Sequence, residues 1–213
     1  LAAAPWEAMV VGDGLLADLM DVGRRLTLPG MAPGRAGGDR RRILIVADPA
    51  GDLPHARREG EIVAGVIHVP PLDDLYVGIV GSGATKNGVT MTVDPRTSLG
   101  EAVLATGFPY DRRERAHGLV SVFARAIEQG RAVRRCGAAA LDLMGVASGV
   151  FGGFWEEGLA PWDMAAGVAL VRAAGGTVTG FEGAPFDLDD GRIIASNGAL
   201  HEALTSLVGS GAG

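Results

Sequence analysis

The sequence predicts a layered α/β fold of the α+β kind, and two observations support this prediction. The first is the order of patterns along the chain: one helix, then a strand-rich stretch, then short strands alternating with helices. This order is typical of sheets covered by helices. The second is size and composition, since 213 residues of which 47% are hydrophobic can bury one substantial core.

The first half begins with a predicted helix and continues with strands. Apolar residues at helical spacing predict an amphipathic helix over residues 14–25, with Asp13 as its N-cap. Apolar runs bounded by turn residues predict strands at residues 42–47, 62–68 and 74–80. Asn87-Gly88 lies between two extended segments and predicts a tight hairpin turn.

The second half alternates between the two kinds of element. Strands are expected at residues 102–107, 132–135, 152–156, 177–181 and 192–195, and helices over 115–129, 138–150, 161–174 and from Asn197, as cap, to about 207. Gly175-Gly176 should end the third of these helices. The first should turn one apolar stripe inward, formed by Leu119, Val120, Phe123, Ala126 and Ile127.

Composition argues against several classes of function. The formal charge of −6 makes a nucleic-acid partner unexpected, and the arginines at 40–42 and 112–115 are interpreted as solvated. With Cys136 as its single cysteine, the chain can form neither an internal disulfide nor a cysteine-based zinc site. Residues 1–5 lack a signal-peptide pattern, and no apolar run reaches the length of about 18 residues that a membrane span needs. A cytoplasmic protein without a membrane partner is therefore expected.

Four blocks in the second half carry a resemblance to a known family. They are Ala-Thr-Gly-Phe-Pro-Tyr at 105–110, Arg-Cys-Gly-Ala-Ala-Ala-Leu-Asp-Leu at 135–143, the Phe-Trp-Glu-Glu to Ala-Ala-Gly stretch at 154–167, and Ala-Gly-Gly at 174–176 with Ile-Ala-Ser-Asn at 194–197. In order and spacing they resemble the inositol monophosphatase superfamily. The resemblance implies an αβαβα sandwich whose N-terminal part is truncated or rearranged. We expect a reduced α+β lobe over 1–110 and an α/β lobe over 111–213, together forming one compact unit.

The segment Gly137-Ala138-Ala139 is the candidate anion site. It opens a predicted helix, and a helix N-terminus with small side chains presents N–H groups and a positive dipole end to a phosphate or sulfate. The alternative is that Gly137 only separates a strand from a helix. Family members usually carry Ser or Thr where this chain has Ala138, so one hydrogen-bond donor is missing.

Two carboxylates have both a functional and a structural interpretation. The resemblance implies that Asp163 is a catalytic magnesium ligand and that Glu156 contacts substrate hydroxyls. Asp163 could instead only compensate the dipole of the helix that starts at Pro161. Glu156 could be no more than an exposed charge at a strand end.

Much of the family's metal-binding set is not found. The family uses an early Glu-Glu pair and an Asp-Pro-x-Asp-Gly-Thr turn, and magnesium needs several oxygen ligands. The nearest candidate turn is Asp48-Pro-Ala-Gly-Asp52, which follows the predicted strand 42–47. An equally good alignment with the family makes residues 43–47 the strand that follows the Asp-Pro-x-Asp-Gly-Thr turn, so that the turn itself is missing from this chain. Asp48 and Asp52 are therefore weaker candidates as catalytic residues and ligands, and Mg²⁺ is possible with an incomplete ligand set.

Three hypotheses of function follow. The first is a degenerate family member that keeps its anion pocket and acts on a small anionic metabolite, as a subunit or repurposed catalyst in a bacterial pathway, for example one of specialised metabolism. The second is a Mg-dependent phosphomonoesterase for sugar, inositol or nucleotide phosphates, with Asp48, Asp52 and Asp163 as ligands. The third is an inert structural partner. Because family members commonly dimerise, a homodimer or a heterodimer with a second pathway protein is expected.

Overall fold

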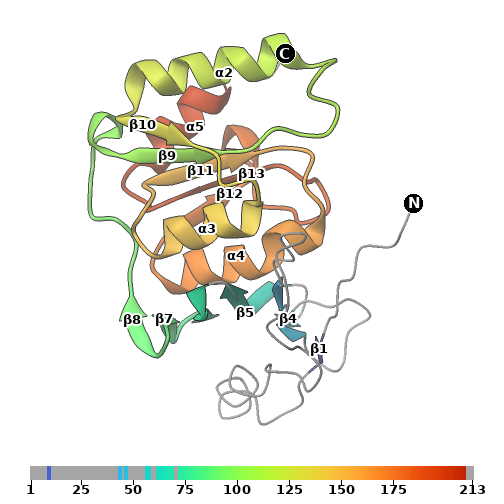
Figure 1. The fold of residues 1–213 in the computed structure, drawn as a ribbon, viewed down its shortest axis with the longest axis vertical. Coiled ribbons are helices and arrows are strands. Elements are labelled where there is room, and N and C mark those ends of the chain that lie inside the picture. The colour runs from blue at the N-terminus through green and yellow to red at the C-terminus, as the bar shows by residue number, and fades with distance from the viewer. Residues whose placement is uncertain are drawn as a thin grey trace.

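The computed structural model describes residues 9–10, 43–44, 46–47, 56–58, 61–69 and 72–209. These residues form four layers: a helix pair, a five-stranded sheet, a second helix pair and a six-stranded sheet (Figure 1). The mixed α/β class is confirmed. The predicted helix over 14–25, which would belong to a fifth layer, lies outside the described residues. In the ranges just given, no helix is both long and apolar enough to cross a membrane.

The six-stranded sheet is antiparallel and contains the strands predicted in the first half. Its order is β2-β5-β6-β7-β8, and β4 also pairs with β5. The bounds are β2 Ile43–Leu44, β4 Ala56–Arg58, β5 Glu61–Val69, β6 Asp74–Ile79, β7 Gly83–Lys86 and β8 Val89–Met91. The run 42–47 was predicted as one strand, but it supplies β2 to this sheet and β3 (Val46–Ala47) to a parallel pair with β1 (Met9–Val10).

The Asn87-Gly88 turn between β7 and β8 is confirmed. Both residues have a positive φ, 50° and 79°, as a two-residue hairpin loop that follows the strand twist requires. The Asn87 side chain also fixes the turn to β6: its Oδ1 accepts the Leu75 N–H at 2.7 Å, and its Nδ2 donates to Asp74 at 2.9 Å.

The five-stranded sheet, in the order β10-β9-β11-β13-β12, determines where the site lies. Its strands are β9 Val103–Thr106, β10 Ala132–Arg134, β11 Gly153–Glu156, β12 Thr177–Thr179 and β13 Ile193–Ser196. The first three in spatial order run parallel, with Trp155 in register with Thr106. The carboxyl ends of β9, β10 and β11 therefore meet at one edge, which is where open α/β sheets bind ligands.

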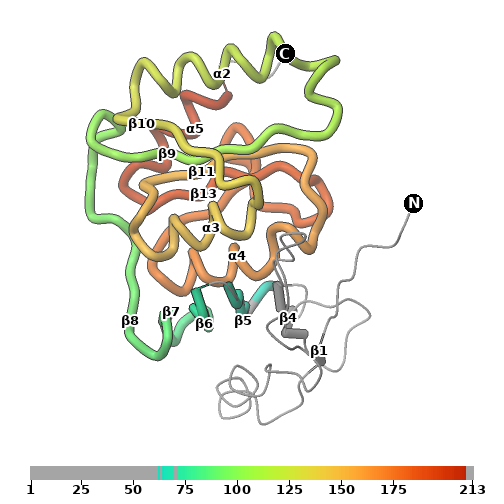
Figure 2. The backbone as a smooth tube through the Cα atoms, in the orientation of Figure 1, coloured from blue at the N-terminus to red at the C-terminus, as the bar shows by residue number. Residues whose placement is uncertain are grey.

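The central helix layer consists of α3 (Ala139–Ala147) and α4 (Pro161–Ala173). It lies between the two sheets, whereas α2 (Ala116–Gln129) and α5 (His201–Gly209) cover the outer face of the five-stranded sheet (Figure 2). Because α4 packs against α3 and both sheets, all residues from Met164 to Val171 are buried. A Cβ on Gly65 of β5 would lie 2.5 Å from the Ala166 carbonyl oxygen, so glycine permits this close approach of helix and sheet. As predicted, Gly175 follows α4 with a φ of 91°.

The predicted inward stripe of α2 was wrong at two positions. Val120 and Ile127 are 58% and 59% exposed, whereas Ala126 is fully buried. The inward face includes Val122 instead, which packs against the core between α2 and α5. The helix belongs to the outermost layer and buries only one narrow face, so its spacing alone did not determine which of two adjacent stripes faces inward.

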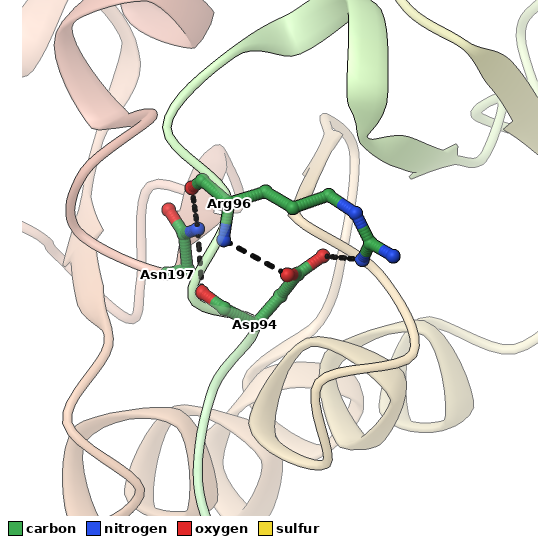
Figure 3. Close-up of polar contacts among 3 residues, drawn as sticks. All are labelled: Asp94, Arg96 and Asn197. Atoms are coloured by element: carbon green, nitrogen blue, oxygen red, sulfur yellow. Dashed lines mark hydrogen bonds and ion pairs between the residues drawn. The ribbon is translucent and has the colours of Figure 1, made fainter.

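A buried asparagine connects the segment between the two sheets to the start of α5 (Figure 3). The Asn197 Nδ2 donates to the carbonyl oxygens of Asp94 and Arg96, each at 2.7 Å. Its Oδ1 accepts the Leu200 N–H at 2.9 Å. Since α5 starts at His201, Asn197 holds the turn before the helix and is not its N-cap as predicted. The Asp94 carboxylate accepts the Arg96 backbone N–H at 3.0 Å and a guanidinium N–H at 2.7 Å.

The division into lobes at residue 110 stays a prediction. The five-stranded sheet takes β9 from before that boundary and its other strands from after it. The connection between the sheets, residues 92–102, carries the short helix η2 (Leu99–Glu101).

Candidate functional site

The candidate site lies at the edge where β9, β10 and β11 end. Glu156 is the last residue of β11, Asp142 lies in the first turn of α3, and Asp163 lies in the first turn of α4. The charges of Asp142 and Asp163 both raise the pKa of Glu156, so both aspartates lie in its neighbourhood; these three residues are called the carboxyl cluster below. The fold thus brings together Glu156 and Asp163, which the sequence singled out, with Asp142, which it did not.

Glu156 occupies a partly buried position that disfavours its charged form. Burial, followed by the charges of Asp142 and Asp163, raises its pKa from the ordinary 4.5 to about 7, while the nearby Arg135 opposes the rise. The carboxyl group lies against Gly107, just after β9, where any Cβ would overlap it. The interpretation of Glu156 as a merely exposed strand-end charge was therefore wrong.

Asp163 has the structural role that its position suggested. Its Oδ2 accepts the Ala160 N–H at 3.0 Å, which is one half of a capping box at the start of α4. The other half is absent because alanine has no side-chain acceptor, and the Asp163 N–H donates to the Ala160 carbonyl at 2.9 Å instead. Burial raises its pKa, while the Ala160 hydrogen bond lowers it. One carboxylate oxygen thus holds the helix start, and the magnesium-ligand role remains a prediction.

Asp142 is the site residue that the sequence analysis missed. It is 1% exposed, and its Oδ1 accepts the Cys136 N–H at 3.3 Å, so it braces the turn before α3. A signal was present: in Ala-Ala-Leu-Asp-Leu a carboxylate interrupts a helical run of small and apolar residues. A buried charge needs a partner, and such a position therefore indicates either a buried hydrogen bond or a site.

The candidate anion turn at Gly137–Ala139 opens α3 as predicted. Gly137 has a φ of 81°, and a Cβ there would meet no atom within 4 Å, so the turn faces open space. Ala138 is the N-cap residue and makes no side-chain cap. The hydrogen bonds to the Ala138 carbonyl are donated by Leu141 and Asp142. The N–H groups ahead of these two stay outside the ladder of α3, as at any helix start.

Arg135 is a second residue that the sequence reasoning quoted without assigning it a role. Its guanidinium carbon lies 4.4 Å from the centroid of the Phe108 ring, a cation–π distance, and its charge lowers the pKa of Glu156. Phe108 follows β9 and Arg135 follows β10, so the parallel pairing of these strands brings the two together. Arg135 supplies a positive charge beside the carboxyl cluster.

The described residues do not by themselves fit a magnesium site. Among them, no group of three or more His, Cys, Asp or Glu side chains is arranged to hold a metal ion. Magnesium requires near-octahedral oxygen coordination, and Asp163 already uses one oxygen to accept a backbone N–H. Asp48 and Asp52, the other candidate ligands, lie outside the described residues.

Known proteins resemble this chain over about two thirds of its length or somewhat more. An inositol-1-monophosphatase of Synechocystis is 41% identical over 141 residues, which are 66% of this chain and 49% of that protein. One of Rhizobium meliloti is 42% identical over 71% of this chain and 57% of its own length. The Nus factor SuhB of Pseudomonas aeruginosa is 38% identical over 70% and 56%. The chain thus spans about half the length of the curated relatives it matches.

Solved structures agree with this result. The inositol monophosphatase from Anabaena superposes with a TM-score of 0.68 and 42% identity, covering 70% of this chain and 59% of that one. The Thermotoga maritima IMPase gives a TM-score of 0.65 and 29% identity over 90% and 78%. The model of the inositol monophosphatase family matches residues 56–211. Since this match covers well over half of the sequence, the chain belongs to the inositol monophosphatase family.

Proposed function

We propose that this chain binds a small phosphate or sulfate ester at the edge formed by β9, β10 and β11, without hydrolysing it as a standard family phosphatase does. The anion would lie at the Gly137–Ala139 turn, and a hydroxyl of the ligand would contact Glu156. The observation that carries the proposal is the juxtaposition of the Glu156–Asp142–Asp163 cluster with Arg135 at this edge.

The charges of the cluster set a condition on binding. The cluster holds three carboxyl groups and Arg135 acts on Glu156, so a phosphate dianion is repelled unless a proton or a cation joins the cluster. With a pKa of about 7, Glu156 can take up that proton near neutral pH. A protonated Glu156 donates a hydrogen bond to a ligand oxygen, whereas an ionised one only accepts. We therefore expect anion affinity to rise as the pH falls through about 7.

Two observations support binding without the usual hydrolysis. Ala138 stands where the family carries a hydroxyl, so the turn offers backbone N–H groups alone. In addition, Asp163 already uses one carboxylate oxygen to accept the Ala160 N–H. Such a protein would serve as a subunit or repurposed catalyst for a small anionic metabolite, paired with a second copy or with another protein of a bacterial pathway, for example one of specialised metabolism.

A second candidate is a Mg-dependent phosphomonoesterase, favoured by specific observations. Relatives named inositol-1-monophosphatase are about 40% identical to this chain. A divalent cation would also neutralise Asp163, whose pKa is raised by burial. Asp163 would then be the catalytic metal ligand, and Asp48 and Asp52 would have to supply the remaining ligands.

Calorimetry with inositol 1-phosphate, with and without MgCl₂, tests both candidates. We expect binding without magnesium and no release of phosphate. In Glu156→Gln the affinity should no longer fall above pH 7, because its amide is neutral and can donate at every pH. Multi-site magnesium binding lost in Asp163→Asn, together with phosphate release, would refute the first candidate and support the second. No binding of phosphate, sulfate or inositol 1-phosphate under any condition would leave only an inert structural partner. Co-purification from the native host tests whether a second protein is bound.

A further inference from the structure

A histidine outside the candidate site connects three elements of the outer face. His201 is the first residue of α5, which packs against β13 and η3 (Phe181–Gly183). Its Nδ1 lies 2.9 Å from Ser196 Oγ at the end of β13, and its Nε2 lies 3.0 Å from Thr179 Oγ1 at the end of β12. One imidazole thus bridges two hydroxyls on two neighbouring strands.

The remaining contacts of these hydroxyls determine where the protons lie. Thr179 Oγ1 donates to the Gly180 carbonyl at 2.8 Å, so it can only accept from Nε2. Ser196 Oγ accepts the Gly198 N–H at 3.1 Å, and its own hydrogen is left to donate to Nδ1. This arrangement pairs every polar hydrogen of the group: Ser196 O–H to Nδ1, Nε2–H to Thr179, and Thr179 O–H to Gly180.

Every other protonation state leaves a buried hydrogen without a partner. If Nδ1 carried a proton, in the other tautomer or in the imidazolium, it would donate to Ser196 Oγ. The Ser196 hydroxyl hydrogen would then lose its acceptor, and Ser196 is fully buried. An unpaired buried donor is costly because water cannot replace the lost partner.

We infer that His201 is an acid-sensitive latch, neutral and protonated on Nε2, that fastens the start of α5 to β12 and β13 and is released when the imidazole takes up a second proton. The latch concerns the outer face of the five-stranded sheet. It is independent of the carboxyl cluster, which lies at the sheet edge beside α3 and α4.

The surroundings of His201 favour the neutral form. Burial lowers its pKa below the ordinary 6.5, and no charged group contributes to this change. The ionisable residues of the elements packed against α5, and of α5 itself, are His117, Arg125, Glu128, Glu156, Glu182 and Glu202. Because the folded pKa is lowered, the latch is fully effective above pH 6.5 and is lost as the pH falls below that value.

Nitrogen NMR of the full chain labelled on histidine is the first test. At pH 7.5 we expect His201 to show a protonated Nε2 and an unprotonated Nδ1, because these signals differ strongly between tautomers. A protonated Nδ1 at that pH would overturn the inference. This measurement needs no variant and therefore does not depend on whether a variant folds.

The second test is hydrogen exchange of the backbone amides of α5 at pH 7.5 and at pH 5.5. The measured quantity is the protection factor, which corrects each exchange rate for the intrinsic rate at that pH. Protection of α5 should fall by about tenfold or more between the two pH values, consistent with the loss of one buried hydrogen bond. His201→Gln cannot take up a second proton, so it should abolish this loss even if it lowers protection at pH 7.5. His117→Gln, an exposed histidine on α2, is the matched control and should behave like the unaltered protein. Equal protection at both pH values in the unaltered protein, or an unchanged loss in His201→Gln, would refute the latch.

Discussion

Replacing Glu156 by glutamine should stabilise the folded chain, and by an amount that depends on pH. The folded state raises the pKa of this carboxyl group from about 4.5 to about 7. Between these values the folded chain therefore binds more protons than the unfolded chain, and stability falls as the pH rises across that window. A tenfold change in an acid dissociation constant corresponds to about 1.4 kcal/mol, so ionising Glu156 in the folded state costs about 3 kcal/mol.

Glutamine keeps the shape of the protonated side chain but cannot ionise. Near pH 4.5 the variant and the unaltered protein should have similar free energies of unfolding. Above pH 7 the variant should be more stable by up to about 3 kcal/mol, because the unaltered chain must bury a charge and place it near Asp142 and Asp163. Residues of a binding site often lower the stability of the folded chain, so a gain in stability when this carboxylate is removed is expected if Glu156 belongs to such a site.

Urea unfolding at closely spaced pH values from 4.5 to 8 measures this difference. The contribution of His201 to stability has the opposite pH dependence. It cancels when the free energy of unfolding of the unaltered protein is subtracted from that of Glu156→Gln, because both proteins contain His201. Glu128→Gln, on the exposed end of α2, controls for the loss of one negative charge and should give a curve parallel to the unaltered one. A difference that stays constant with pH, or a Glu156→Gln variant that is less stable at pH 8, would refute the reasoning.

Three further substitutions test the packing and the site. Gly65→Ala places a Cβ 2.5 Å from a backbone oxygen of α4 and should lower the free energy of unfolding in urea by about 3 kcal/mol. Gly100→Ala is the control: the nearest atom to its Cβ lies at 3.7 Å, and the free energy of unfolding should change by less than about 1 kcal/mol. Asn197→Ala leaves two carbonyl oxygens and one N–H without their partner and should cost about 3 kcal/mol, seen as a lower Tm; an unchanged Tm would show that water replaces the amide. Gly107→Ala places a Cβ where the end of the flexible Glu156 side chain lies and pushes it aside. Calorimetry should therefore show about tenfold weaker binding of inositol 1-phosphate, while the free energy of unfolding changes little. An unaltered affinity would show that Glu156 does not contact the ligand.

The sequence by itself determined the elements of the second half and the family. Helix ends were readable because they depend on local chemistry: Pro161 at the first turn of α4 and Gly175 after its last turn. The same holds for the Asn87-Gly88 turn, whose backbone conformation few other residue pairs adopt. These signals act within a few residues of one another and need no information about the rest of the chain.

Only the tertiary structure decided which residues share a site and in what state. Asp142 was passed over because its role depends on Glu156, which lies in a different element and is brought close to it by the packing of α3 against β11. The ionisation of Glu156 likewise follows from burial and from its neighbours across the sheet edge. The inward stripe of α2 was misjudged because two adjacent apolar stripes fit the same spacing. Contacts between residues distant in sequence carry these properties, and a linear pattern does not contain them.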